Sequence, residues 1–181
     1  MLDPYRCYHG LAMAEAARRF RISILIEAPF RGWLDRAALR RLAARVLRAE
    51  GVAPPAEVGL VVTDDETLGD LNRRYLGLDE PTDVLSFGHE PFDELRAEPF
   101  DRLRTEPFVT PPDGVRRLGE VILSYPTAER QAREAGRGVQ EEAAHLVVHG
   151  LLHLLGYDHD DPEDERRMRT REEELLGRQA H

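Results

Sequence analysis

HGLLHLLGYDH, residues 149–159, predicts a helix that ends in a turn and carries three histidines. His149 and His153 are four residues apart, so on a helix both imidazoles project from one face, one turn apart. Gly156 allows the backbone conformation in which helices commonly stop, and the turn after it can bring His159 back toward the pair. Three imidazoles that leave a fourth position open are typical of a catalytic zinc site, so we expect one zinc ion per chain, held by His149, His153 and His159.

The histidine spacing is also compatible with a different metal or with no metal. Imidazole binds nickel, copper and iron as well as zinc, and a histidine in an apolar stretch is commonly a core residue with a satisfied hydrogen bond. His145 lies one turn before His149, but it is eight residues from His153, which is about 12 Å along a helix axis. We therefore interpret His145 as a core residue or as a partner behind the ligands.

The same histidine spacing occurs in the metzincin peptidases, whose pattern is His-Glu-x-x-His-x-x-Gly-x-x-His. In those enzymes the glutamate is the general base that activates water. Gly150 occupies its place here and has no proton-accepting group. A zinc-dependent, peptidase-like metallohydrolase is therefore the alternative that the spacing suggests and that Gly150 disfavours.

The length and composition predict a cytoplasmic protein that makes no membrane contact. A chain of 181 residues fits one domain with a real core, and no apolar run is long enough to cross a bilayer. Residues 1–20 lack the continuous apolar segment of a secretory signal. The single Cys7 cannot form an internal disulfide, as expected in a reducing compartment.

The net charge of −9 argues against loose binding to nucleic acid, which requires positive surface. All 25 basic residues are arginine, and five of them fall in the run Arg36, Arg40, Arg41, Arg45 and Arg48. This run predicts mainly the solvated face of an amphipathic helix, with a phosphate-binding patch as the second interpretation.

Strand-like and helix-like segments follow one another along the chain and predict an α+β fold, with a single small mixed sheet of about four strands packed with helices. The zinc site lies on a helix and the turn after it. The expected strands are 21–27, 57–63, 83–87 and 118–124, and the expected helices are 36–49, 65–75, 127–135, 139–155 and 162–176. Residues 1–20 are expected to be an N-terminal extension, and residues 21–178 one metallohydrolase domain. Residues 90–114, where Glu-Pro-Phe recurs with a period of eight, are expected to be a loop insertion.

Three blocks of the sequence, taken in order, resemble the YbeY endoribonuclease family of bacterial rRNA maturation factors. They are LNRRY at 71–75 with PTDVLSF at 81–87, LGEVI at 118–122, and the histidine segment. The resemblance implies a single-strand-specific, zinc-dependent endoribonuclease that acts in 16S rRNA 3′-end maturation and ribosome quality control. It implies single-stranded RNA or rRNA, and the ribosome or small-subunit factors, as partners. It also places the family's zinc ligands on His149, His153 and His159.

The chain departs from the family pattern at the position after Tyr75. The family usually has an arginine there, which is thought to help hold the RNA backbone, whereas this chain has Leu76. Arg73 or Arg74 is the nearest replacement, and since neighbours on a helix point about 100° apart, only one of them is expected to face the cleft. Leu71 and Tyr75 are expected to share the core-facing side, and Arg74 is the favoured catalytic residue. Two further departures are Gly88 for proline and Glu120 for aspartate.

Several groups around the predicted metal have two interpretations each. Asp158 and Asp160 flank His159, and they either orient the imidazoles or cap the final helix. Thr82, Asp83 and Ser86 either line the cleft or make a turn. The attacking nucleophile is either water or the ribose 2′-hydroxyl. A non-catalytic ribosome-binding factor with a stabilising zinc is the third function considered.

Overall fold

The computed structural model describes residues 19–79, 82–88, 113–158 and 161–177. The predicted N-terminal extension and the loop insertion at 90–114 lie almost entirely outside these residues, and so do His159 and Asp160. The described elements are β1 (Phe20–Ile26), η1 (Ala28–Phe30), α2 (Arg36–Ala49), β2 (Ala56–Thr63), α3 (Asp65–Leu71), η2 (Asn72–Leu76), β3 (Val84–Gly88), β4 (Arg116–Ser124), α4 (Tyr125–Glu134), α5 (Val139–Leu154) and α6 (Pro162–Leu176).

The four strands form one sheet in the order β1-β2-β4-β3. The first three are parallel to their neighbours, and β3 runs antiparallel to β4 at one edge. This arrangement confirms the predicted α+β fold with a mixed sheet of about four strands. Because β3 is an edge strand, one side of it is not paired with any other described strand.

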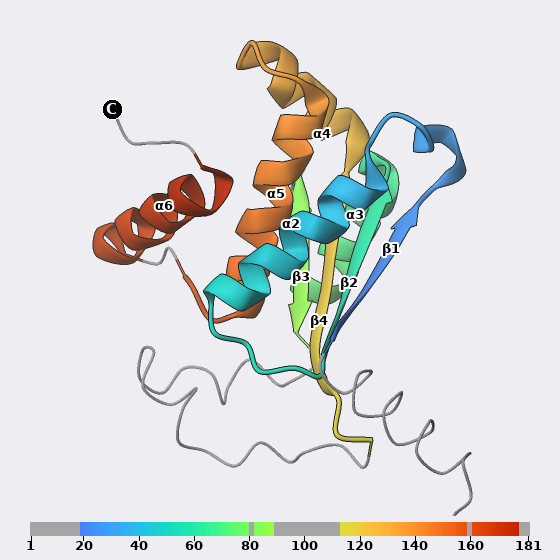
Figure 1. Ribbon diagram of the computed structural model, residues 1–181. Coiled ribbons are helices and arrows are strands. Elements are labelled where there is room, and N and C mark those ends of the chain that lie inside the picture. The colour runs from blue at the N-terminus through green and yellow to red at the C-terminus, as the bar shows by residue number, and fades with distance from the viewer. Residues whose placement is uncertain (1–18, 80–81, 89–112, 159–160, 178–181) are drawn as a thin grey trace, which may run out of the picture.

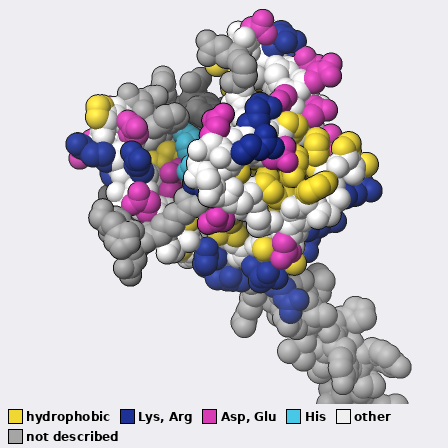
Figure 2. Space-filling view, turned by 90° about the horizontal axis from the view of Figure 1, so that it is seen from above, with side chains coloured by type: hydrophobic (Ala, Val, Ile, Leu, Met, Phe, Trp, Pro, Cys, Tyr) yellow, Lys and Arg dark blue, Asp and Glu magenta, His cyan; other side chains and the backbone are white. Residues whose placement is uncertain are grey.

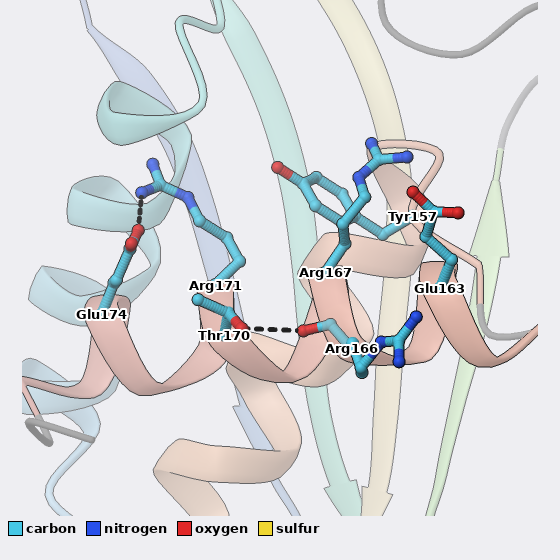
Figure 3. A pocket seen from close by; sticks show the side chains of 7 residues that line it. All are labelled: Tyr157, Glu163, Arg166, Arg167, Thr170, Arg171 and Glu174. Carbon is cyan, nitrogen blue, oxygen red and sulfur yellow. Dashed lines mark hydrogen bonds and ion pairs between the residues drawn. The ribbon is translucent and has the colours of Figure 1, made fainter. Parts of the chain in front are cut away.

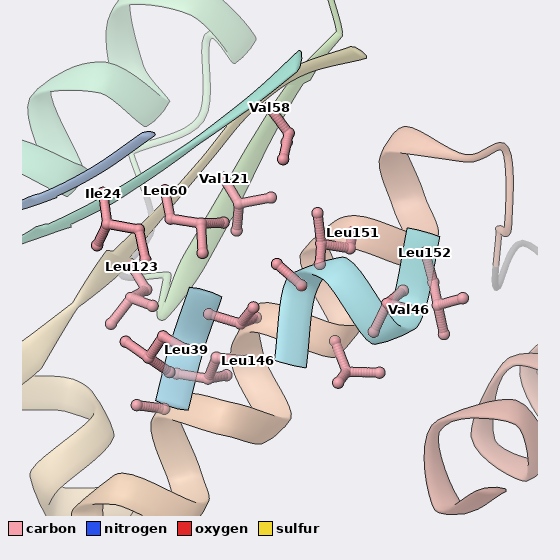
Figure 4. Close-up of a cluster of buried hydrophobic side chains, with 14 of the residues drawn as sticks. Ile24, Leu39, Val46, Val58, Leu60, Val121, Leu123, Leu146, Leu151 and Leu152 are labelled. Atoms are coloured by element: carbon pink, nitrogen blue, oxygen red, sulfur yellow. The ribbon is translucent and has the colours of Figure 1, made fainter. Parts of the chain in front are cut away.

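Helices α2 and α5 pack on one face of the sheet, and α3 packs on the other face (Figure 1). The main core lies between the sheet and helices α2 and α5. Its fully or almost fully buried residues include Leu39, Val46, Leu60, Val121 and Leu151 (Figure 4). Helix α6 lies outside α5 and adds Met168 and Leu175 to this core. The alternation of β4 sends Val121 and Leu123 into the main core, while Ile122 packs with Leu68 and Leu85 below α3.

The arginines of α2 mostly fasten this helix to its neighbours. Arg40 donates to the carbonyl oxygen of Ile22, and Arg45 donates to that of Leu175 at 2.7 Å. The guanidinium of Arg48 lies 5.7 Å from the ring centre of Phe20. These contacts favour a structural role for the run over a phosphate-binding patch.

Candidate metal centre and active site

His149 and His153 lie one turn apart on α5, as their spacing predicted, and their Nε2 atoms are 3.1 Å apart. Zinc binds imidazole nitrogen at about 2.0–2.1 Å with tetrahedral geometry, which places two ligand nitrogens about 3.3 Å apart. The separation of the two Nε2 atoms therefore fits two ligands of one metal ion.

The other nitrogen of each ring fixes its tautomer. His149 Nδ1 is 2.7 Å from Oε1 of Glu172, and His153 Nδ1 is 3.0 Å from the carbonyl oxygen of Tyr157. Since a carboxylate and a carbonyl only accept, each Nδ1 is assigned a proton, and a ring with its single proton on Nδ1 has Nε2 as its donor atom toward a metal. In this tautomer the two Nε2 atoms, 3.1 Å apart, are both electron-pair donors, which is an arrangement that suits a shared metal ion.

Glu172 is the carboxylate behind the pair, and the sequence pattern did not predict this role. It sits on the buried side of α6, between Met168 and Leu175, with 8% of its surface exposed. Burial acts to raise the pKa of Glu172, but hydrogen bonds from His145 and His149 lower it to about 2. The carboxylate is therefore ionised at neutral pH and can accept the His149 proton. A glutamate on the apolar stripe of a charged helix was the signal that could have identified it.

His145 lies between two buried carboxylates rather than beside the Nε2 atoms. Its Nε2 is 3.5 Å from Glu172 and its Nδ1 is 3.4 Å from Glu142, whose side chain also pairs with Arg137. The hydrogen bond with Glu172 raises the pKa of His145, although burial opposes this shift. The structure thus places His145 behind the proposed ligands, one of its two predicted roles.

Gly150 separates the two histidines and brings α5 very close to the sheet. A Cβ atom at this position would lie 2.5 Å from Cγ1 of Val121 and 3.0 Å from Oγ of Ser86. The Ser86 hydroxyl donates to the Gly150 carbonyl oxygen at 3.0 Å. The position that carries the metzincin glutamate therefore faces the sheet, and a side chain there has no room.

Other polar residues expected near the metal have mainly structural contacts. Thr82 donates to the carbonyl oxygen of Val84, and the Asp83 carboxylate accepts from Gln131. Asp158 is exposed, and the cap of α6 is Asp161, which accepts from the backbone of Glu163 and Asp164. The carboxylate that contacts His149 is Glu172, which was not among the predicted orienting residues, and Asp160 lies outside the described residues.

Arg73 and Arg74 have different surroundings. Arg73 is held by Asp70 at 2.8 Å and by Asp79 at 2.9 Å, whereas the guanidinium of Arg74 lies 5.6 Å from the ring centre of Tyr75. The described contacts place Arg74 beside this ring, on the α3 side of β3, and do not join it to the histidine pair. Of these two arginines, Arg74 is the one without a carboxylate partner among the residues that the structure describes.

Tyr75 does not face the core, and this prediction was wrong. The expectation rested on α-helical spacing from Leu71, but residues 72–76 form a π-helical turn, in which the wider turn rotates later side chains. Tyr75 is exposed and meets Phe87 of β3 edge-on, with ring centres 5.4 Å apart.

The third predicted ligand, His159, lies outside the described residues. Within the part of the chain that is described, no group of three potential metal ligands comes together. The assignment of His159 therefore stays a prediction. Figure 2 shows histidine side chains in a recess of the surface.

A separate open pocket of about 410 Å³ lies along α6 (Figure 3). Two of its three guanidinium groups have carboxylate partners: Arg171 binds Glu50 at 2.6 Å and Glu174 at 2.5 Å, and Arg167 binds Asp164. The Tyr157 hydroxyl also donates to Glu50. We interpret this pocket as the ion-pair network that fastens α6 to α2. No helix in the described ranges has the length and apolar character that a membrane crossing requires.

Comparison with protein families gives a match that covers most of the chain. The family described as "Endoribonuclease YbeY" matches residues 32–180. This range includes every residue of the histidine segment and of η2.

Individual relatives carry the same description. Proteins named "Endoribonuclease YbeY" from Pelotomaculum thermopropionicum and Roseiflexus sp. (strain RS-1) are 46% and 43% identical, over 77% and 86% of this chain and over 83% and 90% of their own lengths. The solution structure of TM1509 from Thermotoga maritima is 24% identical over 86% of this chain and 89% of its own, with a TM-score of 0.49.

Proposed function

Because the chain belongs to the YbeY endoribonuclease family, we propose that it is a zinc-dependent, single-strand-specific endoribonuclease. Its place of action is the cytoplasm, in 16S rRNA 3′-end maturation and ribosome quality control, with the ribosome or small-subunit factors as partners. The observation that carries the zinc proposal is the close pair of Nε2 donor atoms of His149 and His153.

His149 and His153 hold the zinc in this proposal, with His159 as the third ligand. Glu172 and the Tyr157 carbonyl keep the two described imidazoles in the tautomer that binds metal. A bound zinc ion supplies Lewis acidity and lowers the pKa of water at the site. Gly150 carries no base, so proton transfer falls to another group of the site or to the RNA itself.

Arg74 is the proposed contact for the RNA phosphate. A guanidinium that none of the described carboxylates engages can bind phosphate oxygens through paired N–H groups and stabilise the charge that develops during cleavage. Arg73 is engaged by two aspartates, which leaves Arg74 as the replacement for the arginine that the family has at the position of Leu76.

The peptidase alternative is weakened by the packing of Gly150, and the non-catalytic ribosome-binding factor is the main competitor. Zinc-loaded and zinc-stripped protein should be incubated with labelled single-stranded RNA, the same RNA as a duplex, and casein. We expect cleavage of the single strand alone, and only with zinc. Cleavage that survives the removal of zinc contradicts the metal dependence, whereas ribosome binding without any RNA cleavage supports the competitor.

Arg74→Ala should slow cleavage of single-stranded RNA by about ten- to a hundredfold, mainly through kcat, because charge stabilisation in the transition state is lost. Zinc content and fold should not change. The matched control is Arg73→Ala, which removes the neighbouring guanidinium that two aspartates already engage and should change kcat by less than about threefold. Equal effects of the two substitutions, or none, would show that neither arginine has the proposed role.

A further inference from the structure

Three exposed apolar side chains lie close together in the sequence at η2 and just after it, and one of them, Tyr75, contacts β3. The large hydrophobic side chains that are exposed in the described residues are Leu25, Trp33, Tyr75, Leu76 and Leu78, and the last three fall within four positions of one another. They are 60%, 54% and 51% exposed, respectively. Single exposed apolar residues are ordinary, but a group of them beside a site marks a place where something binds.

A π-helical turn in the backbone exposes Tyr75 to solvent. The π-helical turn at 72–76 buries Asn72 and rotates Tyr75 outward, and short π-helical turns are frequent at functional sites. Phe87 supports the ring at 5.4 Å and the Arg74 guanidinium lies 5.6 Å from its centre. The ring is thus held in place, next to a cation, and still mostly open.

We propose that Tyr75 is the platform on which one nucleobase of the RNA substrate stacks, next to the phosphate that Arg74 contacts. This inference rests on the proposed function and adds a subsite to it. Single-stranded RNA is bound by stacking its bases on aromatic side chains while cations follow its backbone. The adjacent Tyr75 and Arg74 match this alternation of base and phosphate, and they supply local positive charge on a chain of net charge −9.

The position of the Tyr75 ring relative to His149 and His153 also supports single-stranded RNA as the ligand of this surface. Phe87, which supports Tyr75, directly follows Ser86, which binds the carbonyl of Gly150 between His149 and His153. The side chains of Ser86 and Phe87 point to opposite faces of the sheet, and β3 is the edge strand of the sheet that the described residues form. An RNA strand that crosses this edge reaches the histidine pair on one side and Tyr75 on the other.

Stacking on Tyr75 would also contribute to strand selectivity. A base inside a duplex is already stacked on its neighbours on both sides, so it has no free face to offer. A base of a single strand can be turned out onto the ring at little cost. The platform therefore favours single strands without reading a base sequence.

The test uses the full-length, zinc-loaded protein and its Tyr75→Ala, Tyr75→Phe and Trp33→Ala variants. Steady-state cleavage is measured on a single-stranded oligoribonucleotide and on a series in which one nucleotide at a time is abasic. We expect Tyr75→Ala to raise KM by about 5- to 140-fold, the loss of one stacked base, with kcat within about twofold. Tyr75→Phe keeps the ring and should keep the parental KM. Trp33→Ala, which removes an exposed aromatic ring outside this group of residues, should change KM by less than about twofold.

The abasic series identifies the stacked base. One abasic position should raise KM for the parent and have no further effect on Tyr75→Ala, since base and ring act on each other. If the parent cleaves RNA but no position behaves in this way, or if Tyr75→Ala keeps the parental KM, the platform is wrong and the endoribonuclease proposal stands. If Tyr75→Ala instead changes only stability or self-association, the surface contacts protein rather than RNA. A parent that cleaves no RNA overturns both proposals.

Discussion

His153→Ala is expected to reduce the zinc content of the purified protein from about one ion per chain to background, and RNA cleavage with it. The substitution removes one of the two Nε2 atoms that lie 3.1 Å apart, and the two proposed ligands that remain, His149 and His159, are too few to hold the ion tightly. Thermal stability should fall as well, because part of the metal's binding energy is folding energy. Elemental analysis and a melting curve measure the two effects. Unchanged zinc content in this variant would rule out the site.

Glu172→Gln should lower the affinity for zinc, but less than His153→Ala does. The amide keeps the size of the side chain but removes the charge that His149 Nδ1 faces at 2.7 Å, and loss of such a partner weakens metal binding by about ten- to a hundredfold. Glu165→Gln makes the same chemical change at an exposed position of α6 and should leave zinc affinity unchanged. Competition with a chelator measures the affinities. Equal affinities for the two variants would show that Glu172 does not act on the metal.

Gly150→Ala is expected to lower the free energy of unfolding by about 2–3 kcal/mol, although alanine normally stabilises a helix by about 1 kcal/mol relative to glycine. The added Cβ would lie 2.5 Å from Cγ1 of Val121, a β-branched side chain with little freedom to move. Relief of this clash must push α5 away from the sheet and weaken the hydrogen bond between Ser86 and the Gly150 carbonyl. Urea denaturation measures the change.

Gly69→Ala is the matched control for this prediction. Gly69 is also a helical glycine, in α3, but an added Cβ there meets no atom within 4 Å. The free energy of unfolding of this variant should rise by about 0.5–1 kcal/mol. The prediction for Gly150→Ala is wrong if the free energy of unfolding changes by the same amount in the two variants. Gly150→Glu, which restores the metzincin residue, should destabilise the fold further and should not produce casein cleavage.

Elements with a regular pattern of apolar residues could be predicted from the sequence. The Asp35 cap and the apolar stripe after it gave α2 as 36–49, and the Pro162 to Leu176 helix was placed at its observed bounds. The prediction that Tyr75 faces the core was wrong because the sequence has no signal for the extra residue of a π-helical turn. An α-helical spacing was therefore applied to residues 71–75.

The candidate site was only partly predictable, for a different reason. The spacing of His149 and His153 is local, and one helix brings the two rings together whatever the rest of the chain does. Glu172 reaches His149 from a helix 23 residues away, and this contact depends on how α6 packs on α5. The tight fit of Gly150 against Val121 and Ser86 depends likewise on the distance between helix and sheet. Such long-range contacts are fixed by tertiary packing and not by spacing.

The contact between Glu172 and His149 has a consequence for the order in which the site matures during protein synthesis. The chain emerges from its N-terminus, so the sheet and α5 are made before α6. His149 and His153 are therefore available while the residue that orients His149 has not yet been translated. Only when α6 packs against α5 does the carboxylate reach the imidazole. A nascent chain that stops before residue 172 has the two imidazoles but lacks the carboxylate that orients one of them, so the proposed metal centre is complete only after α6 has been made.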